Sequence, residues 1–342
     1  MITKIGLDLG YANITLSDVT SGIYREPAVA LVDKGNRSII AVGDSATVAG
    51  NDNPNAILVR PFKNGMLFSS DLTLGVLKSA VKAVMPAEKI RCLIGVPSDF
   101  LPKQDAELFR MLNEAGVDEP FSVKRPLAAL IGAGFSPGIS VISVNIGASC
   151  TDIAVLCHGN IVYTSVTRVG GEDFDEAVRG YISEQGDVKV SLSVARAIKE
   201  RLGAVWEGKE SESLDIDGTL ALTGKKISMN ICTEDIVGVF EKPLSAFLGA
   251  VAEAMKKIPK ESVSDVFANG VVLTGGGAAL YGMDKMLSKV LGIAVHTPVD
   301  PIDSVAKGLS RINTFIPRPR SSGKNITAQL AKFYESRKVG ND

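Results

Sequence analysis

Residues 4–16, KIGLDLGYANITL, decide the fold of this chain. They predict a short apolar strand that carries an aspartate, then a glycine turn and a second alternating strand. The same pattern returns at residues 141–156, VISVNIGASCTDIAVL. Such a hairpin offers backbone N–H groups to an anion, because glycine lets the backbone come close and adopt positive φ. Two of these hairpins facing each other predict a phosphate clamp, in which Asn145 stands where the first copy has Asp8.

Length and composition limit the classes of protein to which the chain can belong. With 342 residues it has room for about two domains, and 45% hydrophobic residues with a net charge of −1 argue against disorder and nucleic-acid binding. Four cysteines without a CxxC pair and only two histidines make a structural zinc site improbable. No signal-peptide pattern and no apolar run of roughly 20 residues is present. We therefore expect a cytoplasmic protein in a reduced compartment.

Strands alternate with amphipathic helices along the chain, which favours an α/β fold. The expected strands are residues 4–9, 12–17, 92–96, 140–144, 152–157, 161–168 and 270–273. The expected helices are residues 71–84, 103–115, 125–134, 172–185, 193–206 and 234–257, the last with Thr233 as its N-cap and a bend at Pro243. A further hairpin is expected at residues 219–231. Because each half opens on a similar hairpin, the chain indicates a duplicated fold with the ligand cleft between the halves.

A third glycine-rich element, VVLTGGGAAL, spans residues 271–280. Its strand ends in Gly275, Gly276 and Gly277 at the entrance to a helix, where a flat ligand or a phosphate can lie against the backbone. With two phosphate hairpins before this element, the chain resembles the actin/sugar-kinase/heat-shock ATPase superfamily, and within it the bacterial actin homologue MreB. Further similar stretches are REPAVALV (25–32), VRPFKNG (59–65), GVPS (95–98), RPLAALIGAG (125–134), RVGGEDFDEAV (168–178) and IKERLGAVW (198–206).

The resemblance implies an actin-like fold with two domains and four subdomains around a nucleotide cleft. Domain I would hold residues 1–139 plus 310–342, and domain II residues 140–309. The cofactors implied are ATP or ADP and Mg²⁺, with Asp8 as the metal position that holds metal-bound water. The other nucleotide-binding positions implied are Gly10, Tyr11, Ala12, Asn13, Lys63, Gly147, Ala148, Ser149, Thr151, Gly170, Gly171, Glu172, Lys199, Glu200, Gly275, Gly276 and Gly277.

Three catalytic positions depart from the family pattern. Arg125 replaces a water-orienting glutamate, Asn145 an aspartate and Cys150 a threonine; in the first loop Tyr11 also replaces a threonine. Hydrolysis needs an aligned water that loses a proton, which Arg125 cannot accept, and Asn145 gives no anionic oxygen to a Mg²⁺ hydration shell. We therefore expect a site that binds nucleotide and cleaves it weakly or not at all. Two interpretations of Arg125 stay open: loss of the base alone, or an arginine in the γ-phosphate site that substitutes for a cation.

These residues predict an MreB-like cytoskeletal protein that forms actin-like filaments for cell shape or intracellular organisation. Its expected partners are further copies of itself and an active paralogue, with no nucleic acid. One alternative is an active ATPase of the same fold, of chaperone-like or segregation type, whose catalytic groups have moved. Another is a non-polymerising adaptor resembling FtsA.

The C-terminal segment has its own pattern. A basic linker with two prolines precedes residues 326–339, whose apolar side chains fall on one helical face with basic residues beside it. Three interpretations stay open: a helix packed on domain I, a helix on a membrane surface, and a helix that binds a partner.

Overall fold

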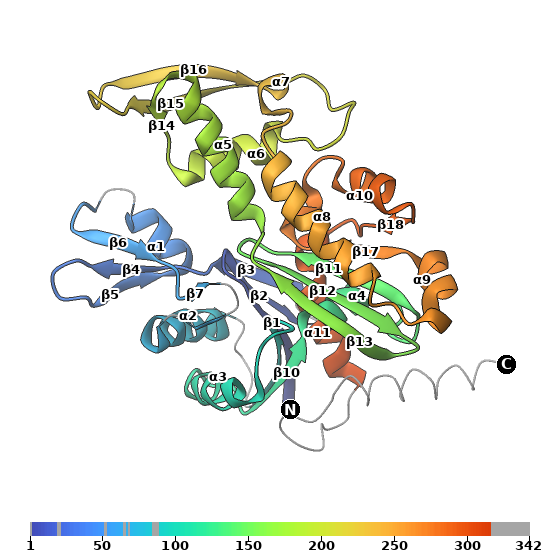
Figure 1. Ribbon diagram of the computed structural model, residues 1–342. Helices are drawn as coiled ribbons and strands as arrows, with labels where there is room; N and C mark the ends of the chain where they lie inside the picture. Colours follow the sequence, from blue (N-terminus) through green and yellow to red (C-terminus); the bar gives the residue numbers. More distant parts are fainter. Residues whose placement is uncertain are drawn as a thin grey trace.

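The computed structural model describes residues 2–18, 22–50, 53–63, 66–67, 69–83 and 89–315 (Figure 1). Two five-stranded sheets form its framework. The first runs β10 (Glu119–Lys124), β9 (Lys89–Val96), β1 (Ile2–Leu9), β2 (Asn13–Asp18), β3 (Gly22–Pro27). The second runs β18 (Val295–His296), β17 (Val271–Thr274), β11 (Val141–Ile146), β12 (Thr151–Cys157), β13 (Asn160–Thr167).

The two sheets repeat one topology. In each sheet, the central strand pairs antiparallel with the next strand of the chain: β1 with β2, and β11 with β12. That second strand then pairs antiparallel with a third, β2 with β3 and β12 with β13. On its other side each central strand pairs parallel with a later strand, β9 or β17. The two predicted phosphate hairpins are therefore the equivalent elements of a duplicated fold.

Helices cover the sheets as the apolar spacing predicts. In α2 (Ser70–Ala83), the buried residues recur at intervals of three and four from Thr73 to Val81. The other helices of the first half are α1 (Gly43–Gly50), α3 (Pro102–Glu114) and α4 (Arg125–Gly132). Those of the second half are α5 (Gly171–Gly186), α6 (Leu192–Leu202), α7 (Thr233–Ile236), α8 (Glu241–Met255), α9 (Val263–Asn269) and α10 (Met283–Leu291), followed by α11 (Ser304–Phe315).

Small sheets extend each half away from its main sheet (Figure 1). The first half carries β5 (Ile39–Val42), β4 (Ala30–Asp33) and β6 (Ala56–Val59), and the short pair β7 (Phe62–Lys63) and β8 (Met66–Leu67). The second half carries β14 (Val188–Lys189), β15 (Ser213–Leu220) and β16 (Lys226–Cys232). The predicted hairpin at residues 219–231 is confirmed at its turn, where Gly224 has a φ of 68° between β15 and β16.

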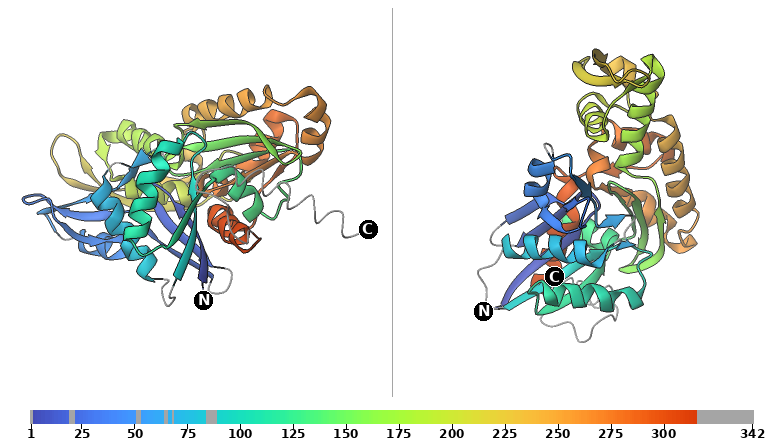
Figure 2. Two further views of the ribbon diagram at one scale, coloured as in Figure 1. Left: turned by 90° about the horizontal axis from the view of Figure 1, so that it is seen from below. Right: turned by 90° about the vertical axis from the view of Figure 1, so that its left-hand side faces the viewer.

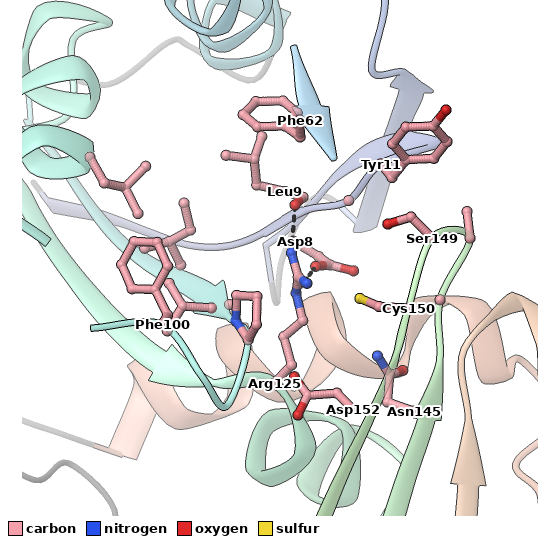
Figure 3. Close-up of a pocket in the computed structure, with 18 residues that line it drawn as sticks. Asp8, Leu9, Tyr11, Phe62, Phe100, Arg125, Asn145, Ser149, Cys150 and Asp152 are labelled. Atoms are coloured by element: carbon pink, nitrogen blue, oxygen red, sulfur yellow. Dashed lines mark hydrogen bonds and ion pairs between the residues drawn. The ribbon is translucent and has the colours of Figure 1, made fainter. Parts of the chain in front are cut away.

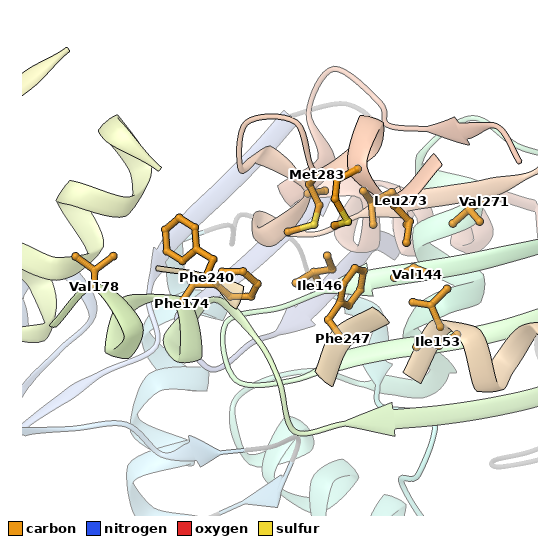
Figure 4. Close-up of a cluster of buried hydrophobic side chains, with 14 of the residues drawn as sticks. Val144, Ile146, Ile153, Phe174, Val178, Phe240, Phe247, Val271, Leu273 and Met283 are labelled. Carbon is orange, nitrogen blue, oxygen red and sulfur yellow. The ribbon is translucent and has the colours of Figure 1, made fainter. Parts of the chain in front are cut away.

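Each half has its own apolar core. In the second half, side chains from β11, β12, α5 and α8 meet, among them Ile146, Phe174 and Phe247 (Figure 4). A separate cluster holds β1, β2, β9, α2 and α3 together in the first half. A third cluster lies between the two sheets, where Leu127 of α4 and Leu309 of α11 are fully buried.

Helices α4 and α11 join the halves (Figure 2). Their backbones pack closely because Gly132 faces the carbonyl oxygen of Ser304 and Gly308 faces that of Ala128, with no room for a Cβ at either glycine. Asn313 of α11 also donates to the carbonyl oxygens of Ile5 (3.0 Å) and Arg91 (3.1 Å) in the first sheet. The contact between these two helices therefore sets how the sheets lie relative to each other.

The predicted helix over residues 234–257 is wrong in three respects. It is interrupted between α7 and α8, where Gly238 has a φ of 85°. Pro243 does not bend a helix, because it lies in the first turn of α8, where the missing N–H is not needed. The residue before α7 is Cys232, so Thr233 is not the N-cap.

Two further sequence predictions concern the end of α6 and the C-terminal tail. Helix α6 stops at Leu202, four residues before the predicted end. The tail helix of residues 326–339 lies outside the described residues, so its three interpretations stay open. No helix within the described ranges is both long and apolar enough to cross a bilayer.

The α4–α11 contact yields a stability prediction. In Gly308→Ala the added methyl group would overlap the Ala128 carbonyl oxygen, so urea denaturation should show a loss of at least about 2 kcal/mol of unfolding free energy. Gly249→Ala is the matched control: this exposed glycine of α8 has no atom within 4 Å of its added Cβ. It should gain about 0.5–1 kcal/mol from helix propensity. Equal effects of the two substitutions would contradict the packing described.

Candidate functional site

A cleft of about 460 Å³ lies between the two halves, a volume that suits a small-molecule ligand. Three glycine-containing turns line it: the turns of the β1–β2 and β11–β12 hairpins and the turn after β17. The predicted site residues that line this cleft are Asp8, Gly10, Tyr11, Ala12, Asn13, Asn145, Gly147, Ala148, Gly171, Lys199, Glu200, Gly275, Gly276 and Gly277.

The two hairpin turns share one hydrogen bond. The amide of Gly10 donates to the carbonyl of Asn13 at 3.0 Å, and the amide of Gly147 donates to the carbonyl of Cys150 at 2.9 Å. Both turns therefore have the same closing contact and present their tips to the same cleft. The repeated sequence pattern thus forms two equivalent turns on one cleft, and phosphate binding by them stays a prediction.

The third turn depends on its glycines. Gly275 has a φ of 84°, and a Cβ there would overlap the Ile146 carbonyl oxygen. A Cβ on Gly277 would overlap the Ile146 side chain. The glycines thus let η2 (Gly276–Ala279) sit directly on the end of β11, which brings the turn to the second hairpin.

Arg125, the first residue of α4, reaches the aspartate of the first hairpin (Figure 3). Its Nε lies 3.2 Å from Asp8 Oδ1, and its Nη2 donates to the Leu9 carbonyl at 2.6 Å. Only 8% of Arg125 is exposed. Burial raises the pKa of the Asp8 carboxyl, and the guanidinium opposes that shift. An arginine ion pair therefore occupies the position that the resemblance gives to a catalytic glutamate and a metal-bound water.

The other two degenerate positions lie beside this ion pair (Figure 3). Thr274 donates a hydrogen bond of 3.2 Å to the amide oxygen of Asn145. Cys150 is buried, and this burial raises the pKa of its thiol, so the neutral thiol persists at neutral pH. With Ser149, these residues line a side pocket of about 70 Å³ next to the cleft.

Asp152 is a buried acid in this side pocket that the sequence analysis did not single out. It is directly opposite Asn145 in the β11–β12 ladder, whereas Asp8 is opposite Thr15 in β1–β2. The second hairpin thus carries its acid on β12, opposite the position of Asn145 on β11. Its Oδ2 accepts from the Ser98 amide at 3.0 Å, its Oδ1 has no hydrogen-bond partner among the described residues, and burial raises its pKa to about 6.

Tyr11 connects the two halves at the cleft. Its hydroxyl donates to Glu172 Oε1 of α5 at 2.7 Å, and the Arg60 guanidinium carbon lies 5.1 Å from the centre of its ring. Arg60 also donates to the carbonyls of Tyr11 and Ala12, both at 2.9 Å. Burial and the Glu172 contact raise the pKa of Tyr11 to about 12. The residue that replaces the family's threonine thus forms a bridge across the cleft.

A buried carboxylate organises the far end of the cleft. Asp175 of α5 is fully buried, and its oxygens lie 2.6 Å from Lys199 Nζ and 3.0 Å from Arg196 Nε of α6. Lys199 also donates to the Gly171 carbonyl at 3.1 Å. Sequence patterns alone could suggest Asp175 only through its spacing within GGEDFDEA. These contacts fix two basic side chains on the cleft wall.

Four predicted binding residues do not line the cleft or its side pocket. Lys63 is exposed on β7. Thr151 is buried and donates to the Val169 carbonyl at 2.7 Å. Gly170 packs beneath the second hairpin turn, where a Cβ would meet the Ala148 backbone. Glu172 contributes through its bond to Tyr11. Across the described ranges, no group of three His, Cys, Asp or Glu residues is arranged to hold a metal ion.

Comparisons with known proteins agree with this architecture. A family model described as MreB/Mbl protein matches residues 2–319. The cell shape-determining protein Mbl of Bacillus cereus is 30% identical over 312 residues, which cover 89% of this chain and 93% of the relative. MreB of Escherichia coli K12 is 30% identical over 316 residues, with 89% and 91% covered.

Solved structures confirm the predicted actin-like fold. MreB5 of Spiroplasma citri bound to ADP superposes with a TM-score of 0.85 at 22% identity, covering 100% of this chain and 99% of the other. The structure of the MamK double helical filament superposes with a TM-score of 0.81 at 22% identity, covering 93% of this chain and 100% of the other.

The buried acid Asp152 yields a pH-dependent prediction. Its pKa is about 6 in the folded chain against an ordinary 3.8, so the folded state binds this proton more tightly. The associated stability is present below pH about 4 and lost as pH rises through 6. Asp152→Asn, which keeps an acceptor for Ser98, should therefore raise the melting temperature at pH 8. The difference between the two pKa values corresponds to at most about 3 kcal/mol of unfolding free energy.

The increase in melting temperature of Asp152→Asn over the wild type should become smaller as pH falls from 8 to 5, because the wild-type carboxyl is protonated at the lower pH. Asp217→Asn on β15 is the control, since Asp217 is exposed and bonded only to exposed Ser228 in this part of the chain. A stability difference for Asp152→Asn that does not change with pH would contradict the assignment.

Proposed function

The chain belongs to the MreB/Mbl family, and we propose that it is a filament-forming actin homologue that binds an adenine nucleotide between its two halves. The observation that carries the proposal is the matched pair of hairpin turns, closed by the same hydrogen bond and facing one cleft. The fold neighbours support it, since MreB5 of Spiroplasma citri is described as bound to ADP or AMPPNP and MamK as a double helical filament.

The proposed nucleotide lies with its phosphates at the two hairpin turns. Lys199 and Glu200 then face the base and ribose, and Gly275 to Gly277 flank the adenosine. The same proposal divides the chain into domain I, residues 1–139 plus 310–342, and domain II, residues 140–309. The boundary at 310 falls within α11, the helix that contacts both sheets.

Weak hydrolysis is part of the proposal. The side chain at the family's base position is Arg125, which donates only and is held by Asp8 and Leu9. The second candidate function is an active ATPase with a displaced base, and Asp152 favours it, because its unpaired oxygen lies in the side pocket with a pKa of about 6. We favour weak hydrolysis, since Arg125 lines the same pocket and its charge opposes the rise in the pKa of Asp152, which makes that carboxylate a weaker base.

The proposed partners follow from the fold. Actin-like protomers that stack head to tail make a heterologous contact that does not close, so open filaments result. We further propose copolymerisation with an active paralogue, a cytoplasmic location and a role in cell shape. Cell shape is the function named for the Mbl and MreB relatives.

Phosphate release tests the catalytic part. Without a positioned base, the chain should release phosphate from ATP about 10²–10⁴-fold more slowly than a relative with the family's glutamate. Arg125→Glu combined with Asn145→Asp should raise the rate. An ordinary family rate that collapses in Asp152→Asn would instead establish the active ATPase with a displaced base.

Sedimentation and electron microscopy test assembly. The protein should pellet and form filaments with ATP or a non-hydrolysable analogue, because the proposal makes nucleotide binding, and not cleavage, the condition for assembly. Monodisperse monomers with ATP, ADP and the analogue alike would contradict the filament proposal and favour a non-polymerising adaptor.

A further inference from the structure

The ion pair between Arg125 and Asp8 bears on the metal that the resemblance implies. A divalent cation with a nucleotide phosphate needs free anionic oxygens, and Mg²⁺ needs them in near-octahedral positions. The two hairpins are the elements expected to supply such oxygens, at Asp8 and Asn145. Whether these residues suit a cation depends on what their oxygens already contact.

Neither residue supplies a carboxylate that is free of an ion pair. The Asp8 carboxylate faces the guanidinium of Arg125 at 3.2 Å. Asn145 is neutral, and its amide oxygen accepts the hydroxyl of Thr274. Asp152 is ionisable, but it lines the side pocket next to the cleft, only 1% of it is exposed, and its Oδ2 already accepts from the Ser98 amide. The residues present therefore do not fit the implied Mg²⁺.

The guanidinium is held firmly in place. Arg125 opens α4, the helix locked against α11, and it bonds to the Leu9 carbonyl at 2.6 Å just before the first hairpin turn. Gly95 on β9 leaves the space for its side chain, since a Cβ there would lie 3.3 Å from Arg125 Cγ. At 8% exposure the charge is shielded from water, so its field at the turn is strong.

We propose that Arg125 is a resident cation of the nucleotide site, so that the cleft binds ADP or ATP without a divalent metal. A guanidinium is permanently charged and its fork of donors matches phosphate oxygens. It neutralises Asp8, which would otherwise repel the phosphates at the adjoining turn. This inference rests on the proposed nucleotide site. It assigns the positive charge beside the phosphates to a side chain of the protein and not to a bound metal ion.

Calorimetric titration of ADP into the full-length protein tests the proposal directly, and ADP avoids any effect of hydrolysis. The dissociation constants in excess Mg²⁺ and in excess EDTA should agree within about threefold. Binding that is at least about tenfold weaker in EDTA would overturn the proposal. Absence of ADP binding in both buffers would instead overturn the proposed nucleotide site itself.

Variants then assign the effect to Arg125. Arg125→Gln should weaken ADP binding in EDTA by about tenfold or more, because it leaves Asp8 unpaired beside the phosphates, and Mg²⁺ should restore part of the affinity. Arg125→Lys keeps the charge and should remain insensitive to EDTA. Arg311→Gln is the matched control, since Arg311 also donates to backbone carbonyls, those of Ile131 (2.9 Å) and Gly132 (3.2 Å), but lines neither the cleft nor the side pocket that holds Arg125.

Melting curves identify any variant that fails to fold, and the wild-type comparison in Mg²⁺ and EDTA needs no variant. A folded Arg125→Gln protein that binds ADP equally well in both buffers would overturn the role of Arg125. Arg311→Gln should bind ADP as the wild type does in either buffer.

Discussion

The close packing of α4 on α11 is the constraint on which the rest of the structure depends. Two glycines, Gly132 and Gly308, let the helix backbones meet between the sheets, and this contact fixes the separation of the two hairpin turns. Because α4 begins at Arg125, the same contact also aims the guanidinium at Asp8. The contact between α4 and α11 therefore sets both the arrangement of the two sheets and the position of the Arg125 charge.

The charges of the two hairpins differ although their backbones are equivalent. The first keeps its acid on the central strand and pairs it with Arg125; the second has Asn145 there and a buried acid, Asp152, across the ladder. Arg125 pairs a permanent cation with the Asp8 carboxylate, and Asn145 has an amide where the first hairpin has a carboxylate. These two groups favour binding an anion and do not favour activating a water molecule. The site thus has two equivalent hairpin turns on one cleft, with Arg125 and Asn145 at the positions where we expect the groups for cleavage.

Local patterns in the sequence were enough to predict the framework and most of the cleft. Gly275 has a positive φ, and a Cβ at Gly10 or Gly147 would lie 2.8 or 3.0 Å from a carbonyl oxygen of its own turn, so local motifs identify these glycines. All three line the cleft. Contacts between distant segments could not be predicted in this way. The bond from Tyr11 to Glu172 and the position of Asp152 opposite Asn145 depend on how the halves and strands align. The break near Gly238 was missed because its apolar spacing continues on both sides.

The central claim is that a protein side chain, Arg125, supplies the positive charge that would otherwise come from a metal ion beside the hairpin turns of a nucleotide cleft. Anomalous diffraction from crystals of the full chain grown with ADP and Mn²⁺ tests it most directly. The account predicts ADP phosphates at the two hairpin turns, the Arg125 guanidinium still on Asp8, and no manganese peak beside that carboxylate. A manganese ion bound near Asp8, with Arg125 displaced from it, would contradict the account.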